Sequence, residues 1–212
     1  MSDAIAHSLL AFALTSFVIE ITPGPNMAYL GALSLSQGIR VGLAAVAGVA
    51  LGLSIYGLAA TLGLSAVIDS SRFFYETLRW AGVIYLLWLA WDAWAAERGP
   101  SAAADGQPAT SPRTAFRRGL ITNLLNPKAA VFYVAVLPDF IRIGHGPVAV
   151  QTLTLSAIYV AIATTIHLTF VLLASHMQGM IESPDKRRNI RRTMAVLLAA
   201  ITVWFAFSTQ RG

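Results

Sequence analysis

Long runs of apolar residues alternate with short polar segments along the whole chain. The runs cover roughly residues 4–37, 41–68, 74–94, 120–139, 148–175 and 194–208. A helix of about 20 apolar residues crosses the hydrocarbon core of a bilayer, and all but the last of these runs reach about that length. The pattern predicts an all-α, polytopic membrane protein with six transmembrane helices.

The first of these runs is too long for one span and contains helix breakers near its middle. As one straight helix, residues 4–37 would extend roughly 50 Å, against a hydrocarbon core of about 30 Å. Pro23 and Pro25 flank Gly24 inside the run. Proline lacks a backbone donor and clashes with the preceding turn, and glycine adds conformational freedom. We therefore expect helix 1 to be broken within residues 22–26.

A second interruption lies about a hundred residues later, in the fourth apolar run. Residues 123–129 read Asn-Leu-Leu-Asn-Pro-Lys-Ala, and Pro127 predicts a break in helix 4. Two interrupted segments at corresponding positions of two half-chains indicate the binding site of a transporter. Unwound backbone at membrane depth must be enclosed by protein or line a wet cavity, because each unpaired group costs several kcal/mol. We expect the two breaks to meet and form a polar site.

Composition supports a membrane location and excludes several other classes. Hydrophobic residues make up 56% of the 212 residues and charged residues only 12%, against about 25% charged residues in soluble domains. Cysteine is absent, which excludes a disulfide framework and a thiolate metal site. We predict no cofactor and no metal. The N-terminus lacks the basic region of a signal peptide, so we expect the first helix to be retained.

The net charge of +5 would suggest a nucleic-acid partner in a soluble protein. Here the basic residues lie in short loops between apolar runs, where they determine topology, and no nucleic-acid partner is expected. Ten follow the first, third and fifth runs: Arg40, Arg98, Arg113, Arg117, Arg118, Lys186, Arg187, Arg188, Arg191 and Arg192. Four lie on the opposite side: Arg72, Arg79, Arg142 and Arg211. We expect a cytoplasmic-membrane protein with its basic loops in the cytoplasm and both termini outside.

A segment of small residues and prolines, residues 96–114, divides the chain and is predicted to be a flexible cytoplasmic linker. It separates two three-helix repeats, residues 1–95 and 115–212, within one membrane domain. Because each repeat has an odd number of spans, the second must be inverted relative to the first. In the second run Ala44, Gly48 and Gly52 share a face on which another backbone can pack closely. That face would serve a homodimer as readily as an internal contact.

The residues at the two breaks are the candidates for the substrate site or transport pathway. They are Glu20, Thr22, Pro23, Gly24, Pro25, Asn26, Asn123, Asn126, Pro127 and Lys128. Helix N-termini after the two breaks suit a carboxylate, and unwound carbonyls suit an ammonium. Such a site fits a zwitterionic amino acid, with the lipid bilayer and protons as further partners.

Three ionisable residues have alternative roles. Glu20 is costly to place in a membrane, so we expect a pathway group or proton carrier, the alternative being an interfacial position. Lys128 could bind a substrate carboxylate or form a structural ion pair with Glu20. His167 lies inside the fifth run and is a second candidate proton carrier, because histidine exchanges protons near neutral pH. The alternative for His167 is a hydrogen-bonded packing role.

Both breaks resemble signatures of the LysE/RhtB family of amino-acid exporters. The similar segments are residues 22–26 with residues 34–42, and residues 123–129 with Leu137 and Pro138. The resemblance extends along essentially the whole chain, including the six-span layout and the variable central linker. It implies export of amino acids or close derivatives (basic, homoserine- or threonine-like, branched or sulfur-containing) by proton exchange. Relatives commonly have Gln at the position of Asp139; if Asp139 faces the pathway, this departure leaves the preferred substrate charge open.

Other functional classes fit the sequence less well. A membrane-embedded enzyme is not expected, since the chain has no metal-ligand cluster, no HExxH or GxSxG motif and no suitably spaced intramembrane carboxylates. An ion channel would need rings of acids, and only Glu20 and Asp139 qualify. The leading hypothesis is a secondary exporter of amino acids that works by alternating access and proton antiport. The alternative is a permease for another small metabolite or ion with the same fold.

Overall fold

The computed structural model of the chain describes residues 2–22, 24–63, 72–95, 110–142, 144–179, 189, 192–200 and 202–203. These residues form helices and turns, with no strand among them. The α-helices are α1 (Ser2–Ile21), α2 (Pro25–Gln37), α3 (Ile39–Thr61), α5 (Arg72–Ala95), α6 (Pro112–Leu124), α7 (Pro127–Val131) and α8 (Val148–Gly179). Residues 192–200 and 202–203 are also helical. The all-α prediction is therefore confirmed for the described part of the chain.

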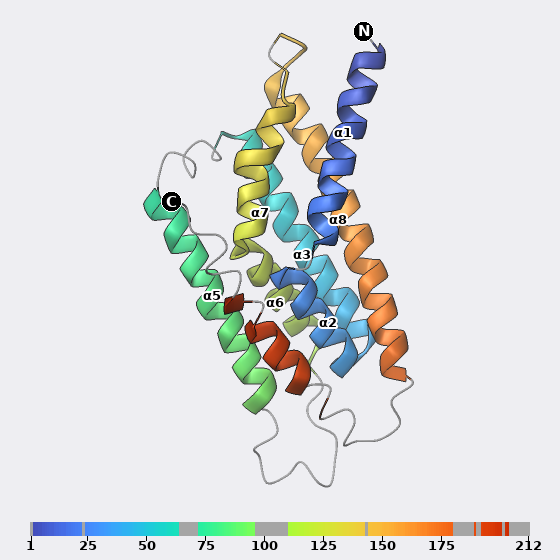
Figure 1. Cartoon of the computed structure of the whole chain (residues 1–212), viewed down its shortest axis with the longest axis vertical. Coiled ribbons are helices and arrows are strands. Elements are labelled where there is room, and N and C mark those ends of the chain that lie inside the picture. Colours follow the sequence, from blue (N-terminus) through green and yellow to red (C-terminus); the bar gives the residue numbers. More distant parts are fainter. Residues whose placement is uncertain are drawn as a thin grey trace.

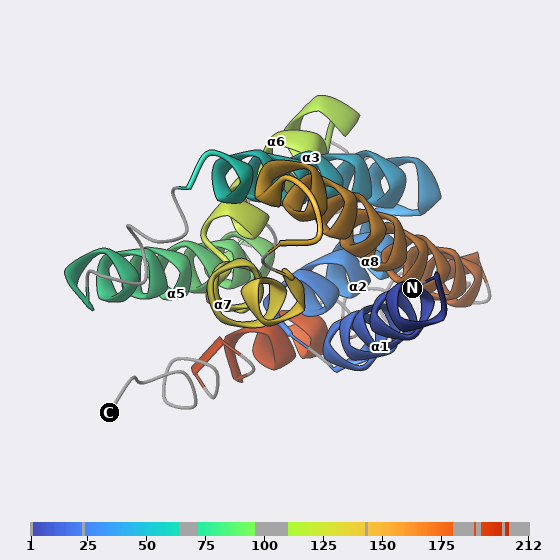
Figure 2. The ribbon, with the colours of Figure 1, turned by 90° about the horizontal axis from the view of Figure 1, so that it is seen from above.

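The helices form an elongated bundle (Figure 1). In that view α1 descends to mid-height and α2 continues to the lower end, while α6 and α7 ascend in the same stepwise manner. Seen from above, α7 lies between α5 on one side and α1 and α8 on the other (Figure 2). Among the described residues, α3 and α8 are each long and apolar enough to cross a membrane. The count rises to four spans if each broken helix crosses once, and the arrangement of six spans in inverted repeats stays a prediction.

Both broken helices bend where the prolines lie. The segments His7–Ile21 and Pro25–Gln37 meet at 56°, and Pro112–Leu124 and Pro127–Phe140 meet at 49°. In each pair the second helix has its proline in the first turn, where a missing N–H removes no helical hydrogen bond. Each proline thus starts a new helix instead of interrupting the interior of an old one.

Glycines allow α3 and α6 to pack backbone against backbone. A Cβ atom on Gly48 would collide with the carbonyl oxygen of Phe116, and one on Gly119 would collide with that of Ala45. Small residues permit this close approach between membrane helices. The close-packing role predicted for Gly48 is confirmed, and this face is used inside the chain.

Helix α6 begins earlier than the apolar pattern indicated. The sequence analysis started the fourth span after Gly119 and placed residues up to 114 in the linker, whereas the helix starts at Pro112. Ser111 explains the difference, because its side chain accepts a hydrogen bond from the Thr114 N–H at 3.2 Å and caps the helix. The Thr110 N–H also donates to Gln37 Oε1 at 3.2 Å, which holds this start next to the end of α2. Residues 96–109 of the predicted linker lie outside the described residues.

Beyond the second break the helix is irregular. Residues Phe132–Val136 form a π-helical turn and Leu137–Phe140 a 3₁₀ turn. A π-helical turn widens the helix locally, and such turns are frequent at functional sites. Phe132 and Tyr133, at the start of this turn, are almost completely buried. The sequence pattern did not reveal these two turns.

Candidate substrate site at the two helix breaks

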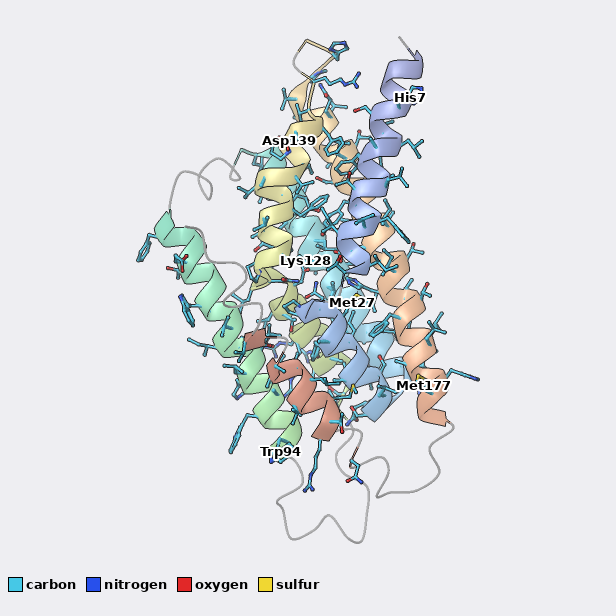
Figure 3. The ribbon with its side chains drawn as sticks, viewed as in Figure 1. His7, Met27, Trp94, Lys128, Asp139 and Met177 are labelled. Atoms are coloured by element: carbon cyan, nitrogen blue, oxygen red, sulfur yellow. The ribbon has the colours of Figure 1, made fainter. Side chains whose placement is uncertain are left out.

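The two breaks lie near the middle of the long axis of the bundle. Figure 3 shows Lys128 and Met27 at mid-height, whereas Asp139 lies towards the upper end and Trp94 and Met177 towards the lower end. Four helix ends meet at this level: the C-termini of α1 and α6 and the N-termini of α2 and α7. Helix ends leave backbone groups without intrahelical partners, so the region is polar by construction.

The first break, between Ile21 and Pro25, has no side-chain cap. Gly24 is the N-cap of α2, in extended conformation with φ −151° and ψ −178°, and makes no side-chain capping bond. The Thr22 hydroxyl donates back to the Val18 carbonyl oxygen at 2.9 Å, within its own helix. Pro23 lies outside the described residues. The backbone carbonyl of Thr22 therefore remains available for a partner from another element.

The second break, between Leu124 and Pro127, is held by its own residues and by two neighbouring helices. The Asn126 side-chain oxygen accepts a hydrogen bond from the Lys128 N–H at 3.0 Å and caps α7. The Tyr56 hydroxyl, on α3, donates to the Leu124 carbonyl oxygen at 2.8 Å. On α5, Gly82 lies so close to the Leu125 carbonyl oxygen that a Cβ atom would collide with it.

A cluster of ionisable side chains joins the two breaks. Lys128 Nζ donates to the Thr22 carbonyl oxygen at 2.8 Å and lies 3.5 Å from Glu20 Oε2. On the other side of the carboxylate, the Tyr159 hydroxyl donates to Glu20 Oε1 at 2.8 Å. His167 Nε2 lies 3.9 Å from Glu20 Oε2. Glu20 thus stands between a lysine of the second break and two residues of α8.

The three charged or titratable side chains are buried to different depths. The exposed fraction of the side chain falls from 14% for Lys128 to 5% for Glu20 and 1% for His167. In the described part of the chain neither ring nitrogen of His167 has a hydrogen-bond partner. A small molecule that approaches from the exposed side would therefore meet Lys128 first, and His167 last.

A pair of buried amides forms a second link between the breaks. Asn26 Nδ2 donates to Asn123 Oδ1 at 2.8 Å, and both residues are at most 5% exposed. Asn26 Oδ1 and Asn123 Nδ2 have no hydrogen-bond partner within the described residues. Gly52 makes room for this pair, because a Cβ atom there would lie 2.7 Å from Asn123 Nδ2. One acceptor and one donor are thus buried beside the breaks and unused.

An aromatic column, consisting of Tyr159, Phe132, Phe12 and Phe140, extends from Glu20 towards the upper end. The rings of Tyr159 and Phe132 stack with centroids 3.5 Å apart and planes 12° apart. Phe132 contacts Phe12 at 5.8 Å, and Phe12 contacts Phe140 edge to face at 5.1 Å. Phe140 also lines a cavity of about 190 Å³ with residues of α1, of the loop at Arg142 and of α8. A continuous series of ring contacts therefore links Tyr159, which binds Glu20, to Phe140 at the wall of this cavity.

The structure brings together most of the residues singled out from the sequence. Lys128, Glu20 and the Thr22 carbonyl are in contact, His167 adjoins them, and the two amides pair. Gly24 lies beside the lysine, since a Cβ atom there would be 3.3 Å from Lys128 Cδ. Pro25, Asn126 and Pro127 shape the helix starts. Asp139, in contrast, is exposed and lies apart from Lys128 in Figure 3.

Tyr159 is the site residue whose specific role the sequence did not reveal. Tyr159 and His167 lie eight residues apart on α8, on neighbouring parts of one face. Their shared face could therefore have indicated that Tyr159 lies near His167. Nothing in the spacing indicated that Tyr159 binds Glu20, which is 139 residues away along the chain.

Three features of the structure are typical of a membrane transporter. They are helices long enough to cross a membrane, two breaks at mid-bundle, and charged residues at those breaks. The sequence profile of the LysE type translocator family matches residues 17–210, and the chain belongs to this family. The resemblance found from the two motifs is thereby confirmed. Membership places the chain among the multi-pass membrane proteins of a translocator family.

Several relatives cover most of the chain. An uncharacterized membrane protein of Vibrio cholerae is 31% identical over 84% of this chain and 86% of its own. The homoserine/homoserine lactone efflux protein of Salmonella typhimurium is 28% identical over 90% of this chain and 92% of its own. The leucine efflux protein of Enterobacter sp. strain 638 is 32% identical over 62% of this chain and 63% of its own. No solved structure matches the chain.

Proposed function

We propose that this protein is a secondary transporter that exports amino acids or close derivatives across the cytoplasmic membrane. The observation that carries the proposal is the Glu20–Lys128 ion pair, which joins the two helix breaks in the middle of the bundle. A carboxylate and an ammonium side by side offer one partner for each charge of a zwitterion. The names of the homoserine and leucine efflux relatives support an amino-acid substrate and an outward direction.

The proposed mechanism is alternating access of two inverted three-helix repeats around the breaks. The opposite directions of α1–α2 and α6–α7 support this arrangement (Figure 1). The breaks are joined by exchangeable polar contacts, among them the bond from Lys128 to Thr22 and the bond between Asn26 and Asn123. Each such hydrogen bond contributes only about 0.5–1.5 kcal/mol net, so the contacts can be exchanged as the repeats move.

Protons would drive export, with Glu20 as the carrier and His167 as its neighbour. The position of Glu20 Oε2 between Lys128 and His167 supports this role, because the carboxylate can exchange one partner for another.

The starts of α3 and α6, which carry Arg40, Arg113 and Arg117, lie at the end of the bundle where Thr110 meets Gln37. This concentration of basic residues supports a cytoplasmic location for that end and an external location for the termini.

The test is efflux from cells preloaded with a panel of amino acids, with and without a proton uncoupler. We expect selective efflux of one class of amino acid, lost on uncoupling and lost in Lys128→Ala. Asp139→Asn, which neutralises an exposed acid outside the site, is the matched control and should retain efflux. In Glu20→Gln we expect any remaining efflux to follow the substrate gradient alone. If a folded protein in the membrane exports no amino acid, the proposal is wrong and another small metabolite or ion is the substrate.

A further inference from the structure

We infer that Lys128 occupies the amino-group subsite of the transporter, and that the substrate binds by displacing the lysine ammonium from Glu20 and the Thr22 carbonyl. The inference rests on the proposed function for the chemical class of the ligand, a zwitterionic amino acid. It identifies Lys128 Nζ as the group that occupies the amino-group subsite in this structure. The side-chain ammonium of Lys128 then occupies the position that the amino group of the substrate takes when it binds.

The two acceptors that hold the lysine match what an α-ammonium group requires. An ammonium donates three hydrogen bonds and accepts none. The site offers it the Thr22 carbonyl oxygen at 2.8 Å and Glu20 Oε2 at 3.5 Å. Both acceptors belong to the end of α1, while the lysine belongs to the second break. An external ammonium could therefore take the same two acceptors without any change in the residues that provide them.

The geometry of Glu20 favours displacement of its partner. The Tyr159 hydroxyl holds Oε1 at 2.8 Å, so the carboxylate is fixed on the side away from the lysine. The bond from Nζ to Oε2, at 3.5 Å, is much longer than the roughly 2.7–2.9 Å of a strong charge-assisted hydrogen bond. Glu20 is thus oriented for a cation, while the ammonium of Lys128 lies closer to the Thr22 carbonyl oxygen than to the Glu20 carboxylate.

The lysine side chain also has a way to move. Its backbone is fixed by the Asn126 cap, but a four-carbon stem separates the ammonium from that anchor, and 14% of the side chain is exposed. Gly24 adds space at the inner end, where an added Cβ atom would lie 3.3 Å from Cδ and 3.7 Å from Nζ. The ammonium can therefore withdraw towards the exposed side while the acceptors stay in place.

The charges balance only for a zwitterion. In this structure one lysine neutralises one glutamate. A bound amino acid would pair its ammonium with Glu20 and its carboxylate with Lys128. Two ion pairs would then replace the single Glu20–Lys128 pair, and no charge would be left unpaired. An amine without a carboxylate would leave the lysine unpaired, and a carboxylate without an amine would compete with Glu20. Leaving one member of a buried pair unpaired is strongly unfavourable.

Lys128→Met tests this inference, because it keeps an unbranched stem of four heavy atoms and removes the ammonium. The purified full-length protein would be titrated with leucine, with 3-methylbutylamine, which is leucine without its carboxylate, and with N-acetylleucine. Binding would be measured by calorimetry and by the shift in thermal unfolding. We expect the wild type to bind leucine at least about tenfold more tightly than either analogue, and Lys128→Met to reverse the preference towards the amine by a similar factor. Homoserine and 3-aminopropan-1-ol form a second matched pair.

Two further variants keep the test decisive if the single variant folds poorly. Glu20→Gln/Lys128→Met removes both charges, so it should fold and bind neither leucine nor the amine. Arg117→Met makes the same type of change on the exposed side of α6 and should keep the wild-type preference. The inference is wrong if the amine binds Lys128→Met no better than it binds the wild type, or if the double variant binds the amine as well as the single variant does.

The outcome also separates this inference from the proposed function. In one outcome, cells export no amino acid while the amine still binds Lys128→Met selectively. In that case the inference that Lys128 occupies an amino-group subsite is supported, and the assigned substrate is wrong. If cells export an amino acid while the amine preference does not change, the function stands and the displacement of Lys128 is wrong.

Discussion

The two helix breaks bend their helices by similar angles, 56° and 49°, but they are stabilised in different ways. The second break has its own cap in Asn126, a hydrogen bond from the Tyr56 hydroxyl to the Leu124 carbonyl oxygen, and a close backbone contact at Gly82. The first break begins with Gly24, which makes no side-chain capping bond. Its Thr22 carbonyl is instead paired with an ammonium that belongs to the second break.

This difference indicates which break can respond to a ligand. Contacts built from a break's own backbone and caps persist whatever occupies the site. A contact made by a flexible, charged side chain from elsewhere can be replaced by another cation. We therefore expect the second break to keep its structure, and the first break to change, when substrate binds.

Removal of the Lys128 ammonium from the first break should have the largest effect on stability. In Lys128→Ala the first break loses its partner and Glu20 becomes a buried, unpaired carboxylate, which typically destabilises a protein by about 3–5 kcal/mol. We expect hydrogen exchange to increase strongly at residues 20–26, with little change at residues 120–125. Mass spectrometry of the exchanged protein measures both segments in one experiment.

The double variant Glu20→Gln/Lys128→Ala is the control for that measurement. Because it removes the unpaired carboxylate, we expect it to recover most of the lost stability. Equal increases of exchange at both breaks in Lys128→Ala would contradict the division into a fixed and a responsive break.

Crowding the second break should have the next largest effect. In Gly82→Ala the new methyl group would collide with the carbonyl oxygen of Leu125, and overpacking of this kind typically costs about 1–3 kcal/mol. We expect a lower unfolding temperature, with increased exchange at residues 124–128 instead of at the first break. Ala81→Gly, one residue earlier on α5 and only partly buried, removes a methyl group and serves as a comparison. An unchanged unfolding temperature in Gly82→Ala would mean that α5 does not hold this break.

Loss of the cap of the second break should have a smaller effect. Asn126→Ala removes the acceptor of the Lys128 N–H, and loss of an N-cap typically costs about 1 kcal/mol. Asn126→Ser retains a capping oxygen and should recover most of the difference. Thermal unfolding in the presence and absence of substrate measures both variants. If Asn126→Ala reduces substrate affinity and leaves stability unchanged, the residue is a ligand group and not a cap.

Thr22→Val should have the smallest effect, although Thr22 lies in the first break. Its hydroxyl bonds only within α1, to the Val18 carbonyl, whereas Lys128 binds its backbone carbonyl. An exposed substitution of this kind changes stability by less than about 0.5 kcal/mol. Efflux and unfolding temperature should both remain close to the wild type. A large loss of efflux would show that the hydroxyl contacts the substrate.

The sequence was informative where a local rule decides the structure. Pro25 and Pro127 indicated where new helices start, because proline acts on its immediate neighbours. Gly48 indicated a close helix contact through its spacing along α3, though not that α6 was the partner. The start of α6 was placed too late because one capping serine outweighs an absence of apolar residues.

Contacts between distant parts of the chain could not be predicted in the same way. Pairing of Glu20 with Lys128, across 108 residues, was one of two roles that the sequence left open for the lysine. The bond from Tyr159 to Glu20 and the contact of Gly52 with Asn123 depend on how α3, α8 and the breaks pack together. Helical periodicity reports which residues share a face of one helix, but it does not report which helix that face contacts.

The aromatic column has a consequence for the energy supply of the cell. A carrier driven by a proton gradient dissipates that gradient if a continuous file of water connects its proton site with the outside. Phe132 and Tyr159 lie face to face with centroids 3.5 Å apart, and a water molecule cannot fit between them. Phe12 and Phe140 continue this series of ring contacts as far as the cavity that Phe140 lines. For the proton-driven export proposed above, we expect these stacked rings to impede a continuous file of water along this column.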